Sequence, residues 1–408
     1  MRIALIRRMF SLKRGGAERY CVNLTRQLQR LGHDVTIIGE AIDPALQHEV
    51  RFLPAAIDRS ASWTKNRSFA DNCAEIIARS NFDIVYALSR VPAADCFRVT
   101  DRLHAHWMNV YYRRTWNRWL QHLNPRHRML LQLEREIYRH EGVARIVTQS
   151  RLDSGLVQNY FGVLPHRVRW IANGVDVDHF RPMTISERIA VRNELGIRRD
   201  APLLVFAAMN FAGKGLTAVL RALMSPACRD CRLLVLGGDG TRCPEMRRAQ
   251  RFGVADRVIF AGPRFPLKRY LGAGDLFVLP AAYEPFPNVN LESMACGTPI
   301  LTTTTAGGVD IVQPGVNGYL VTDDQAVDEI AGSVGLFFGQ DAYGREEMRT
   351  ASRETAAQYT LERNAVETVS LFREVLEEKR QSQQSSGSKQ GRRKLPWQAP
   401  APEVLCEL

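Results

Sequence analysis

Two carboxylates, Glu284 and Glu292, stand eight positions apart in a segment that combines a loop with the start of a helix. Pro285 and Pro287 favour an extended loop, and residues 289–295 follow with a helical pattern. Unpaired amides at a helix start attract phosphate, whereas ionised carboxylates accept hydrogen bonds from hydroxyl groups. The segment therefore predicts a site for a ligand that carries both kinds of group, as a nucleotide sugar does.

This segment resembles the E-x7-E signature of the retaining glycosyltransferases of family 4, which have the GT-B fold. The likeness extends beyond the two acids to Pro-Asn-Val at 287–289, Leu-Glu-Ser-Met-Ala-Cys-Gly-Thr-Pro-Ile at 291–300 and Ala-Gly-Gly at 306–308. The resemblance implies an α/β protein with two doubly wound Rossmann-like domains that face a cleft. It also implies an active hexosyltransferase.

The resemblance assigns several residues to the donor. Glu292 is expected on the ribose hydroxyls and Glu284 on the hydroxyls of the transferred sugar. Asn288 and Val289 would offer amides to the phosphates, because Pro287 has no N–H to donate. Arg264 lies where family members hold the nucleotide base.

Lys214 follows a predicted strand at 203–207 and precedes a glycine, so its ammonium is well placed to neutralise a diphosphate. Family members carry an Arg-x4-Lys-Gly segment here, whose two cations hold the donor phosphates, but Met209 occupies the arginine position. The chain therefore lacks a bidentate guanidinium at this point, and Lys214 and helix-end amides are expected to stabilise the leaving diphosphate.

The missing arginine makes the chain similar to the lipopolysaccharide core glucosyltransferase I group, which also has a short loop without it. Further likeness to this group lies in residues 90–95, 97–101 and 138–149. The resemblance then implies a retaining transfer by front-face attack, in which the leaving phosphate oxygen takes the acceptor proton. Catalysis would depend on positioning and on charge stabilisation, with Lys214, Glu284 and Asp101 as the catalytic residues.

In the first half, Gly15 and Gly16 open a helix directly after the first predicted strand. They do not form the G-x-G-x-x-G fingerprint of a dinucleotide site, but they let backbone amides approach a donor phosphate. Asp101 and His104 follow an apolar run and are expected to face the cleft, in the acceptor or sugar pocket.

The elements that must position these residues form two series. Strands are predicted at 2–7, 34–38, 84–87 and 145–148, and again at 203–207, 233–236, 258–260, 276–279 and 300–302. Helix-length segments separate them, which indicates parallel sheets covered on both faces. We expect an N-terminal acceptor domain at 1–175, a C-terminal nucleotide-sugar domain at 176–357, a returning helix at about 358–378 within a helical pattern at 355–378, and a disordered tail at 379–408.

The charge and composition of the first half indicate which partners the protein could bind. The formal net charge is +12, and most of the positive excess lies in the first 180 residues, so the first domain is expected to meet an acidic partner. Arginines and tryptophans occur close together at Arg113, Arg114, Trp116 and Trp119, as in segments that contact an anionic membrane. A partly packed insert is the alternative, and no single-strand-binding module supports a nucleic-acid partner.

No apolar run is long enough to predict a membrane span, and the start of the chain is too short in apolar residues for a signal peptide. We therefore expect a cytoplasmic protein, peripheral on the inner face of the cytoplasmic membrane. The eight cysteines are predicted to be thiols. Asp176 and Asp178 form a D-x-D pattern, but their place in a linker favours a structural role, so neither metal nor cofactor is predicted.

The prediction from sequence is a metal-independent transferase that moves a hexose, with UDP-glucose the favoured donor, to a lipopolysaccharide-core or other lipid-linked or phosphorylated glycan. One alternative is a transferase that acts on an exopolysaccharide intermediate. Another is a non-catalytic membrane or nucleic-acid binding protein that keeps a degenerate transferase fold.

Overall fold

The computed structural model describes residues 1–12, 15–139, 142–211, 213–238 and 244–387, and the chain forms two large parallel β-sheets. The first sheet has seven strands in the order β5-β3-β1-β6-β7-β8-β9. Its strands are β1 (Arg2–Ile6), β3 (Asp34–Gly39), β5 (Arg51–Pro54), β6 (Ile84–Ala87), β7 (Cys96–Arg98), β8 (Arg145–Thr148) and β9 (Val168–Trp170). A small parallel pair, β2 (Met9–Phe10) with β4 (Ala41–Ile42), lies beside it.

The second sheet has six strands in the order β12-β11-β10-β13-β14-β15. Its strands are β10 (Leu203–Ala208), β11 (Arg232–Gly237), β12 (Val258–Gly262), β13 (Leu276–Leu279), β14 (Ile300–Thr303) and β15 (Gly318–Val321). The central strands of both sheets are buried on both faces, which is why they are continuous apolar runs. We call the part of the chain around each sheet the first and the second domain.

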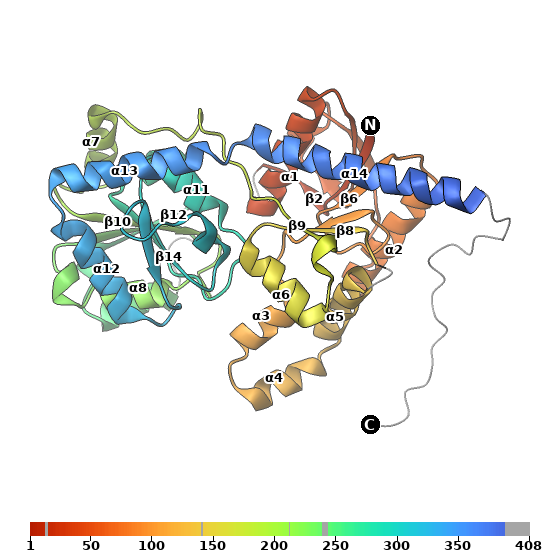
Figure 1. Ribbon diagram of the computed structural model, residues 1–408. Helices are drawn as coiled ribbons and strands as arrows, with labels where there is room; N and C mark the ends of the chain where they lie inside the picture. Colours follow the sequence, from red (N-terminus) through yellow and green to blue (C-terminus); the bar gives the residue numbers. More distant parts are fainter. Residues whose placement is uncertain (13–14, 140–141, 212, 239–243, 388–408) are drawn as a thin grey trace.

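Helices cover both sheets (Figure 1). They are α1 (Gly16–Arg30), α2 (Thr64–Ala78), α3 (His104–Tyr111), α4 (Thr115–His122), α5 (Pro125–Tyr138), α6 (Arg151–Phe161), α7 (Ile185–Glu194), α8 (Leu216–Ala222), α9 (Pro244–Arg251), α10 (Leu267–Ala273), α11 (Asn288–Ala295), α12 (Val327–Gly339), α13 (Ala342–Ala357) and α14 (Leu361–Gly387). Figure 1 shows the two domains side by side, with α4 at the end of the first domain that lies farthest from α14. The predicted α/β class with two doubly wound sheets is confirmed.

The chain crosses between the domains twice, and the two crossings lie together. Val175 and Thr360 form an isolated parallel bridge, and the Val175 amide donates to the Tyr359 carbonyl at 2.9 Å. Gly174 packs so closely here that a Cβ atom would lie 2.4 Å from the Thr360 carbonyl oxygen. After the second crossing, α14 runs over the first domain and packs on α1 (Figure 1).

Two details of the predicted C-terminal region are corrected. The expected helix at 355–378 is split, because α13 ends at Ala357 and α14 begins at Leu361. The tail expected to be disordered from 379 is helical as far as Gly387. Lys379, Arg380 and Gln381 favour helix, no proline interrupts 379–387, and Lys379 pairs with Asp95 at 2.6 Å. The rest of that tail, 388–408, lies outside the described residues.

Candidate active site

The loops after two neighbouring strands bring Lys214 and Glu284 together. Lys214 follows β10 and Glu284 follows β13, and the amide of Ala282 donates to the carbonyl of Gly213 at 3.0 Å, which ties one loop to the other. Gly215 has φ +79°, and a Cβ atom there would lie 2.0 Å from the Pro280 carbonyl oxygen, so only glycine fits. The result is a direct hydrogen bond from Lys214 Nζ to Glu284 Oε2.

Glu284 also receives a cation from the first domain. Arg102 Nε donates to the same oxygen, Glu284 Oε2, at 3.3 Å. Burial alone would raise the pKa of Glu284, but the charges of Lys214 and Arg102 outweigh it and hold that pKa below its ordinary value. Glu284 is thus an ionised acceptor with 23% of its side chain exposed to the cleft.

The backbone around Glu284 is fixed by its neighbours. Its carbonyl accepts the amide of Gly307 at 2.8 Å, and Glu284 forms an isolated bridge with Ala306. A Cβ atom on Gly307 would lie 1.7 Å from the Pro285 carbonyl oxygen, so the Ala-Gly-Gly segment must approach without side chains. The family-like residues 306–308 therefore hold the loop that carries Glu284.

Glu292 lies on α11 and is nearly buried. Arg19 from α1 reaches its Oε1 atom at 3.1 Å, whereas Oε2 has no hydrogen-bond partner within the described part of the chain. Burial raises the pKa of Glu292, and the Arg19 charge offsets this only in part. A buried carboxylate oxygen without a partner is ready to accept a hydroxyl group, which agrees with the expected ribose contact.

The side chain of Asn288 joins α11 to the first domain. Its Oδ1 atom accepts from Asn173 Nδ2, and its Nδ2 atom donates to the Gly16 carbonyl at 3.3 Å. Gly15 is the N-cap residue of α1, so the predicted Gly15-Gly16 loop and the α11 start do lie together. Val289 is the second residue of α11 and is half-buried beside them.

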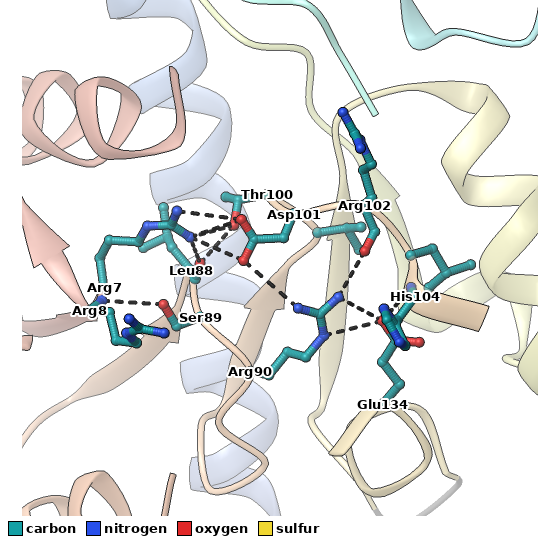
Figure 2. Close-up of polar contacts among 12 residues, drawn as sticks. Arg7, Arg8, Leu88, Ser89, Arg90, Thr100, Asp101, Arg102, His104 and Glu134 are labelled. Atoms are coloured by element: carbon teal, nitrogen blue, oxygen red, sulfur yellow. Dashed lines mark hydrogen bonds and ion pairs between the residues drawn. The ribbon is translucent and has the colours of Figure 1, made fainter. Parts of the chain in front are cut away.

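A charged network surrounds Asp101 (Figure 2). Arg7, at the end of β1, donates to both Asp101 oxygens at 3.4 Å and to Glu18 Oε1 at 2.7 Å. Arg90 Nη1 lies 3.9 Å from Asp101 Oδ2 on the other side. Burial would raise the pKa of Asp101, but Arg7 and Arg90 lower it below its ordinary value. Asp101 is therefore an ionised acceptor, and 47% of its side chain is exposed.

The structure places His104 at the start of α3. Its Nε2 atom lies 3.0 Å from His127 Nδ1, its backbone amide donates to Glu134 at 2.7 Å, and its ring is buried and stacks on Trp107 with the ring centres 5.4 Å apart. Burial lowers the pKa of His104 to about 3, so the ring is neutral. In the structure α3 packs the His104 ring against His127 of α5 and Trp107, and a contact of His104 with acceptor or sugar stays a prediction.

Trp107 itself faces a cavity of about 340 Å³ between the two domains. The lining comes from α3 and the adjoining loop and from the second domain, including Arg102, Tyr111, Arg113, Gly213, Tyr283 and Asp324. The cavity adjoins the Lys214–Glu284 pair through Arg102 and Gly213. An acceptor placed there would meet aromatic faces and guanidinium groups.

Arg113 and Arg264 each contact a group outside the Lys214–Glu284 pair. Arg113 donates to Asp324 of the second domain at 2.6 Å, so its guanidinium joins the domains, and its contact with a membrane stays a prediction. Arg264 follows the edge strand β12, two strands from β10, and its Nε atom donates to the Ala261 carbonyl at 3.1 Å. The structure does not bring Arg264 together with Lys214 and Glu284.

The other three predicted membrane residues, Arg114, Trp116 and Trp119, are exposed, and α4 has no buried residue. The exposed fractions are 62% for Trp116 and 65% for Trp119. Among described residues, no helix is long and apolar enough to cross a membrane.

The remaining sequence predictions concern metal and thiols. In the described ranges no group of three or more His, Cys, Asp or Glu side chains could hold a metal ion. Asp176 accepts the amides of Asp178 and His179 at 3.2 and 2.8 Å, which is a turn within the linker. The six cysteines in the described part of the chain are free.

Sequence reasoning missed four residues of this site: Arg7, Arg19, Arg102 and Tyr283. Tyr283 precedes Glu284, donates to Asp153 Oδ1 at 2.8 Å and accepts the Leu103 amide at 3.2 Å, so it also joins the domains. Arg7 and Arg102 each follow a buried strand of the first sheet directly or within a short loop. Charged residues at the carboxyl ends of parallel strands were the available signal.

Comparison with known proteins adds two family matches. Residues 14–179 match the family described as Glycosyltransferase Family 4, and residues 201–336 match the family described as Glycosyl transferases group 1. A D-inositol 3-phosphate glycosyltransferase of Kribbella flavida is 28% identical over 400 residues, which cover 89% of this chain and 91% of that protein. One of Xylanimonas cellulosilytica is 32% identical over 219 residues, covering 51% of this chain and 52% of that protein. The chain thus spans about half the length of several curated relatives.

Solved structures support the same architecture. WaaG, a glycosyltransferase involved in lipopolysaccharide biosynthesis, superposes with a TM-score of 0.78 at 18% identity, covering 91% of this chain and 99% of WaaG. HepE of Anabaena, in complex with UDP-glucose, superposes with a TM-score of 0.68 at 18% identity, covering 91% of this chain and 99% of HepE. These likenesses confirm the predicted GT-B fold.

Proposed function

We propose that this chain is a retaining hexosyltransferase, because residues 14–179 match the family described as Glycosyltransferase Family 4 and residues 201–336 match the family described as Glycosyl transferases group 1. In this proposal it transfers a hexose from a nucleotide diphosphate sugar to a lipid-linked glycan. The donor is held by the second domain and the acceptor by the cavity beside the first. The activity needs no metal cofactor, since side chains supply the positive charge.

One observation carries the proposal: the direct pair between Lys214 and Glu284 at the carboxyl ends of neighbouring strands. A cation for a leaving phosphate and an ionised acceptor for sugar hydroxyls are the two groups that a glycosyl transfer requires side by side. Glu292, with one oxygen free to accept, lies further along the same segment and suits the ribose. This arrangement argues against the degenerate binding protein considered above.

The proposed chemistry is front-face transfer. The glycosidic carbon–phosphate oxygen bond breaks, the acceptor hydroxyl oxygen bonds to the same face of the sugar carbon, and the leaving phosphate oxygen takes the acceptor proton. Lys214 and the amides at the start of α11 stabilise the charge on the departing diphosphate. Asp101 stays ionised between its two arginines, so its role is to hold a hydroxyl group rather than to donate a proton.

The acceptor is proposed from the surroundings of the cavity. Arg102 and Arg113 line it together with aromatic side chains, which suits a phosphorylated glycan. The exposed helix α4 lies on the same domain and has the composition of a membrane-contacting helix, so a lipid-linked acceptor is favoured. The name of WaaG supports a lipopolysaccharide-core acceptor, and the ligand of HepE supports UDP-glucose as donor. The protein would act at the cytoplasmic face of the inner membrane.

Calorimetric titration of UDP, ADP and GDP, with and without magnesium, tests the donor site. We expect one of the three to bind without metal, and Lys214→Ala to weaken that binding by about 10- to 100-fold, because a charge-assisted contact to phosphate is lost. Lys268→Ala, a lysine of the same domain outside this pair, is the control and should bind like the wild type. If the wild type binds none of the three nucleotides, the transferase proposal is abandoned.

A second assay separates the acceptors. With the donor identified, transfer would be followed to a truncated lipopolysaccharide core, to a lipid-linked exopolysaccharide intermediate and to inositol phosphate. The last acceptor is included because several relatives are named as D-inositol 3-phosphate glycosyltransferases. Transfer to inositol phosphate alone would contradict the lipid-linked acceptor.

A further inference from the structure

The second domain of this chain has one cation where the family-like loop has two. Met209 stands in the arginine position, its side chain is exposed, and Lys214 is the remaining basic residue of that loop. A nucleotide diphosphate carries more negative charge than one ammonium can balance. A second cation near Lys214 is therefore required, and it must come from elsewhere in the chain.

The structure has such a cation on the opposite wall of the cleft. Arg102 of the first domain donates through Nε to Glu284 Oε2 at 3.3 Å, the same oxygen that Lys214 contacts. Two cations therefore converge on one carboxylate, which leaves one positive charge unbalanced at this point. An anionic ligand placed beside Glu284 would complete the balance.

The backbone of Arg102 is held firmly by its surroundings. Its carbonyl oxygen accepts Arg90 Nη2 at 2.8 Å, and the next amide, that of Leu103, donates to the Tyr283 hydroxyl at 3.2 Å. Figure 2 shows the Arg102 side chain extending away from the Arg90–Glu134 contacts, while its carbonyl faces Arg90. The guanidinium is thus carried on a fixed segment toward the second domain, with 33% of the side chain exposed.

Among the described residues, the two terminal nitrogens of the Arg102 guanidinium have no hydrogen-bond acceptor. Within that part of the chain only Nε has one, so the terminal nitrogens are open to the cleft. A guanidinium offers its donors in a planar fork that fits two phosphate oxygens, which an ammonium cannot do. Arg102 can therefore supply the bidentate contact that Met209 cannot.

We propose that Arg102 is the second donor-phosphate cation of this protein, supplied by the first domain in place of the arginine that the loop of the second domain lacks. This inference rests on the proposed transferase function. When the donor binds, Arg102 and Lys214 turn from Glu284 to the diphosphate, and Glu284 is released to accept the sugar hydroxyls. The phosphate site is then complete only while the two domains are together.

The test compares Arg102→Ala with Arg79→Ala by calorimetry, with UDP and UMP as probes, and with the ADP–AMP and GDP–GMP pairs if UDP does not bind. Arg79 is the control, because it is an arginine of the first domain that lies outside the cavity and pairs with Glu75 of α2. We expect Arg102→Ala to weaken diphosphate binding about 10- to 100-fold and monophosphate binding less than about 3-fold. Arg79→Ala should change neither by more than about 3-fold.

A rescue variant adds a readout that a purely structural role would not give. Met209→Arg in the Arg102→Ala background should restore diphosphate binding to within about 3-fold of wild type, since the cation returns from the other side of the cleft. Equal losses in Arg102→Ala and Arg79→Ala, or a loss that is the same for monophosphate and diphosphate, would overturn the inference. Wild-type protein that binds no nucleotide would instead overturn the proposed function.

Discussion

Asp153 is the least expected residue of the domain interface. Its side chain is fully buried, one oxygen accepts the Tyr283 hydroxyl at 2.8 Å, and the other has no partner among the described residues. Burial raises the pKa of Asp153 from 3.8 to about 7, and the charges of Glu284 and Asp310 add to this effect. The residue next to Glu284 is thus held by a carboxyl group that changes charge near neutral pH.

The stability of the protein should depend on Asp153 in a defined direction. The pKa of Asp153 is higher in the folded protein than in the unfolded chain, so the protonated carboxyl group favours folding. This contribution to stability is complete below about pH 4 and is lost as the pH rises to about 7. Asp153→Asn keeps the acceptor for Tyr283 and removes the charge. We expect the variant to be more stable than wild type by up to about 4 kcal/mol at pH 8, with a smaller gain at pH 5.

Thermal unfolding at the two pH values measures this difference. The exposed Asp256→Asn substitution is the control and should leave the unfolding midpoint nearly unchanged at both. A gain for Asp153→Asn that is the same at pH 5 and pH 8 would contradict the titration of Asp153 in this range.

At the residue scale, sequence reasoning succeeded where the partners lie on neighbouring loops of one domain. Glu284 and Lys214 were predicted to converge because both follow strands of the same sheet, and the structure brings them into contact. Asp153 could not be found in this way, because its importance arises from a contact across two domains, which no spacing in one sequence specifies. Arg102 could have been identified as a charged residue after a strand, but its partner in the other domain, Glu284, could not. The sequence did not reveal that the His104 ring is buried, because a histidine that faces a cleft and a histidine packed under a tryptophan have the same local pattern.

At the scale of elements, helix α4 has an exposed apolar surface that its own domain does not cover. Trp116, Trp119, Leu120 and Leu123 are all exposed, and no acidic residue occurs between Asp101 and Glu134. Aromatic rings beside arginines favour the interface of an anionic membrane. The helix is joined to α5, whose Leu130 and Leu133 are buried in the first domain.

If α4 binds a membrane as proposed, replacing both tryptophans by serine should abolish most of that affinity. For Trp116→Ser with Trp119→Ser we expect binding to vesicles of phosphatidylglycerol and phosphatidylethanolamine to fall by roughly 10-fold or more, because two large apolar surfaces are removed. Co-sedimentation with vesicles is the measurement. Nucleotide binding should be unchanged, since α4 contributes no residue to the cavity or the donor site.

Tyr343→Ser is a matched control on the second domain, where another aromatic side chain is exposed to a similar extent. If the double tryptophan variant and the wild type sediment equally with vesicles, α4 is a solvent-exposed insert and the membrane proposal fails.

Most elements could be predicted from the sequence because buried parallel strands are continuous apolar runs. Strands β6, β8 and β13 have the predicted bounds, and other predicted strands differ by one or two residues at their ends. Strands β5, β7, β9 and β15 and the two-residue strands β2 and β4 were not predicted. All are short; β5, β7 and β9 contain arginine, and β15 begins with glycine. The split between α13 and α14 was missed because residues on both sides of it favour helix.

At the scale of the whole molecule, the two sides of the interface between the domains carry opposite charges. Among the residues that the structure describes, three ion pairs cross it: Arg19–Glu292 at 3.1 Å, Arg102–Glu284 at 3.3 Å and Arg113–Asp324 at 2.6 Å. Each arginine belongs to the first domain and each acid to the second. The positive excess of the first half, which the sequence linked to an acidic partner, thus also serves the contact with the second domain.

A high salt concentration should therefore separate the two domains of the protein when no nucleotide is bound. The screening length falls from about 10 Å at 0.1 M salt to about 3 Å at 1 M, which weakens these partly exposed pairs more than the buried Tyr283–Asp153 contact. We expect the radius of gyration from small-angle X-ray scattering to increase between 0.1 and 1 M NaCl. The bound nucleotide diphosphate should suppress the increase.

The double variant Arg19→Gln with Arg113→Gln provides the comparison. Its radius of gyration at 0.1 M NaCl should already approach the value of the wild type at 1 M NaCl. The further increase of that radius with salt should be smaller than in the wild type. A wild-type radius that does not change with salt would show that these ion pairs do not hold the domains together.

The adjacent crossings at Val175 and Thr360 have a consequence for how such a protein can evolve. Because the chain leaves and re-enters the first domain at one point, the second domain is topologically an inserted cassette whose two ends lie together. A recombination event with junctions at these two positions would exchange the whole domain that we propose to bind the donor and leave the other domain intact. If the proposed roles hold, donor and acceptor specificity are inherited separately, except that Arg102, which stays with the first domain, must match the phosphate loop that arrives.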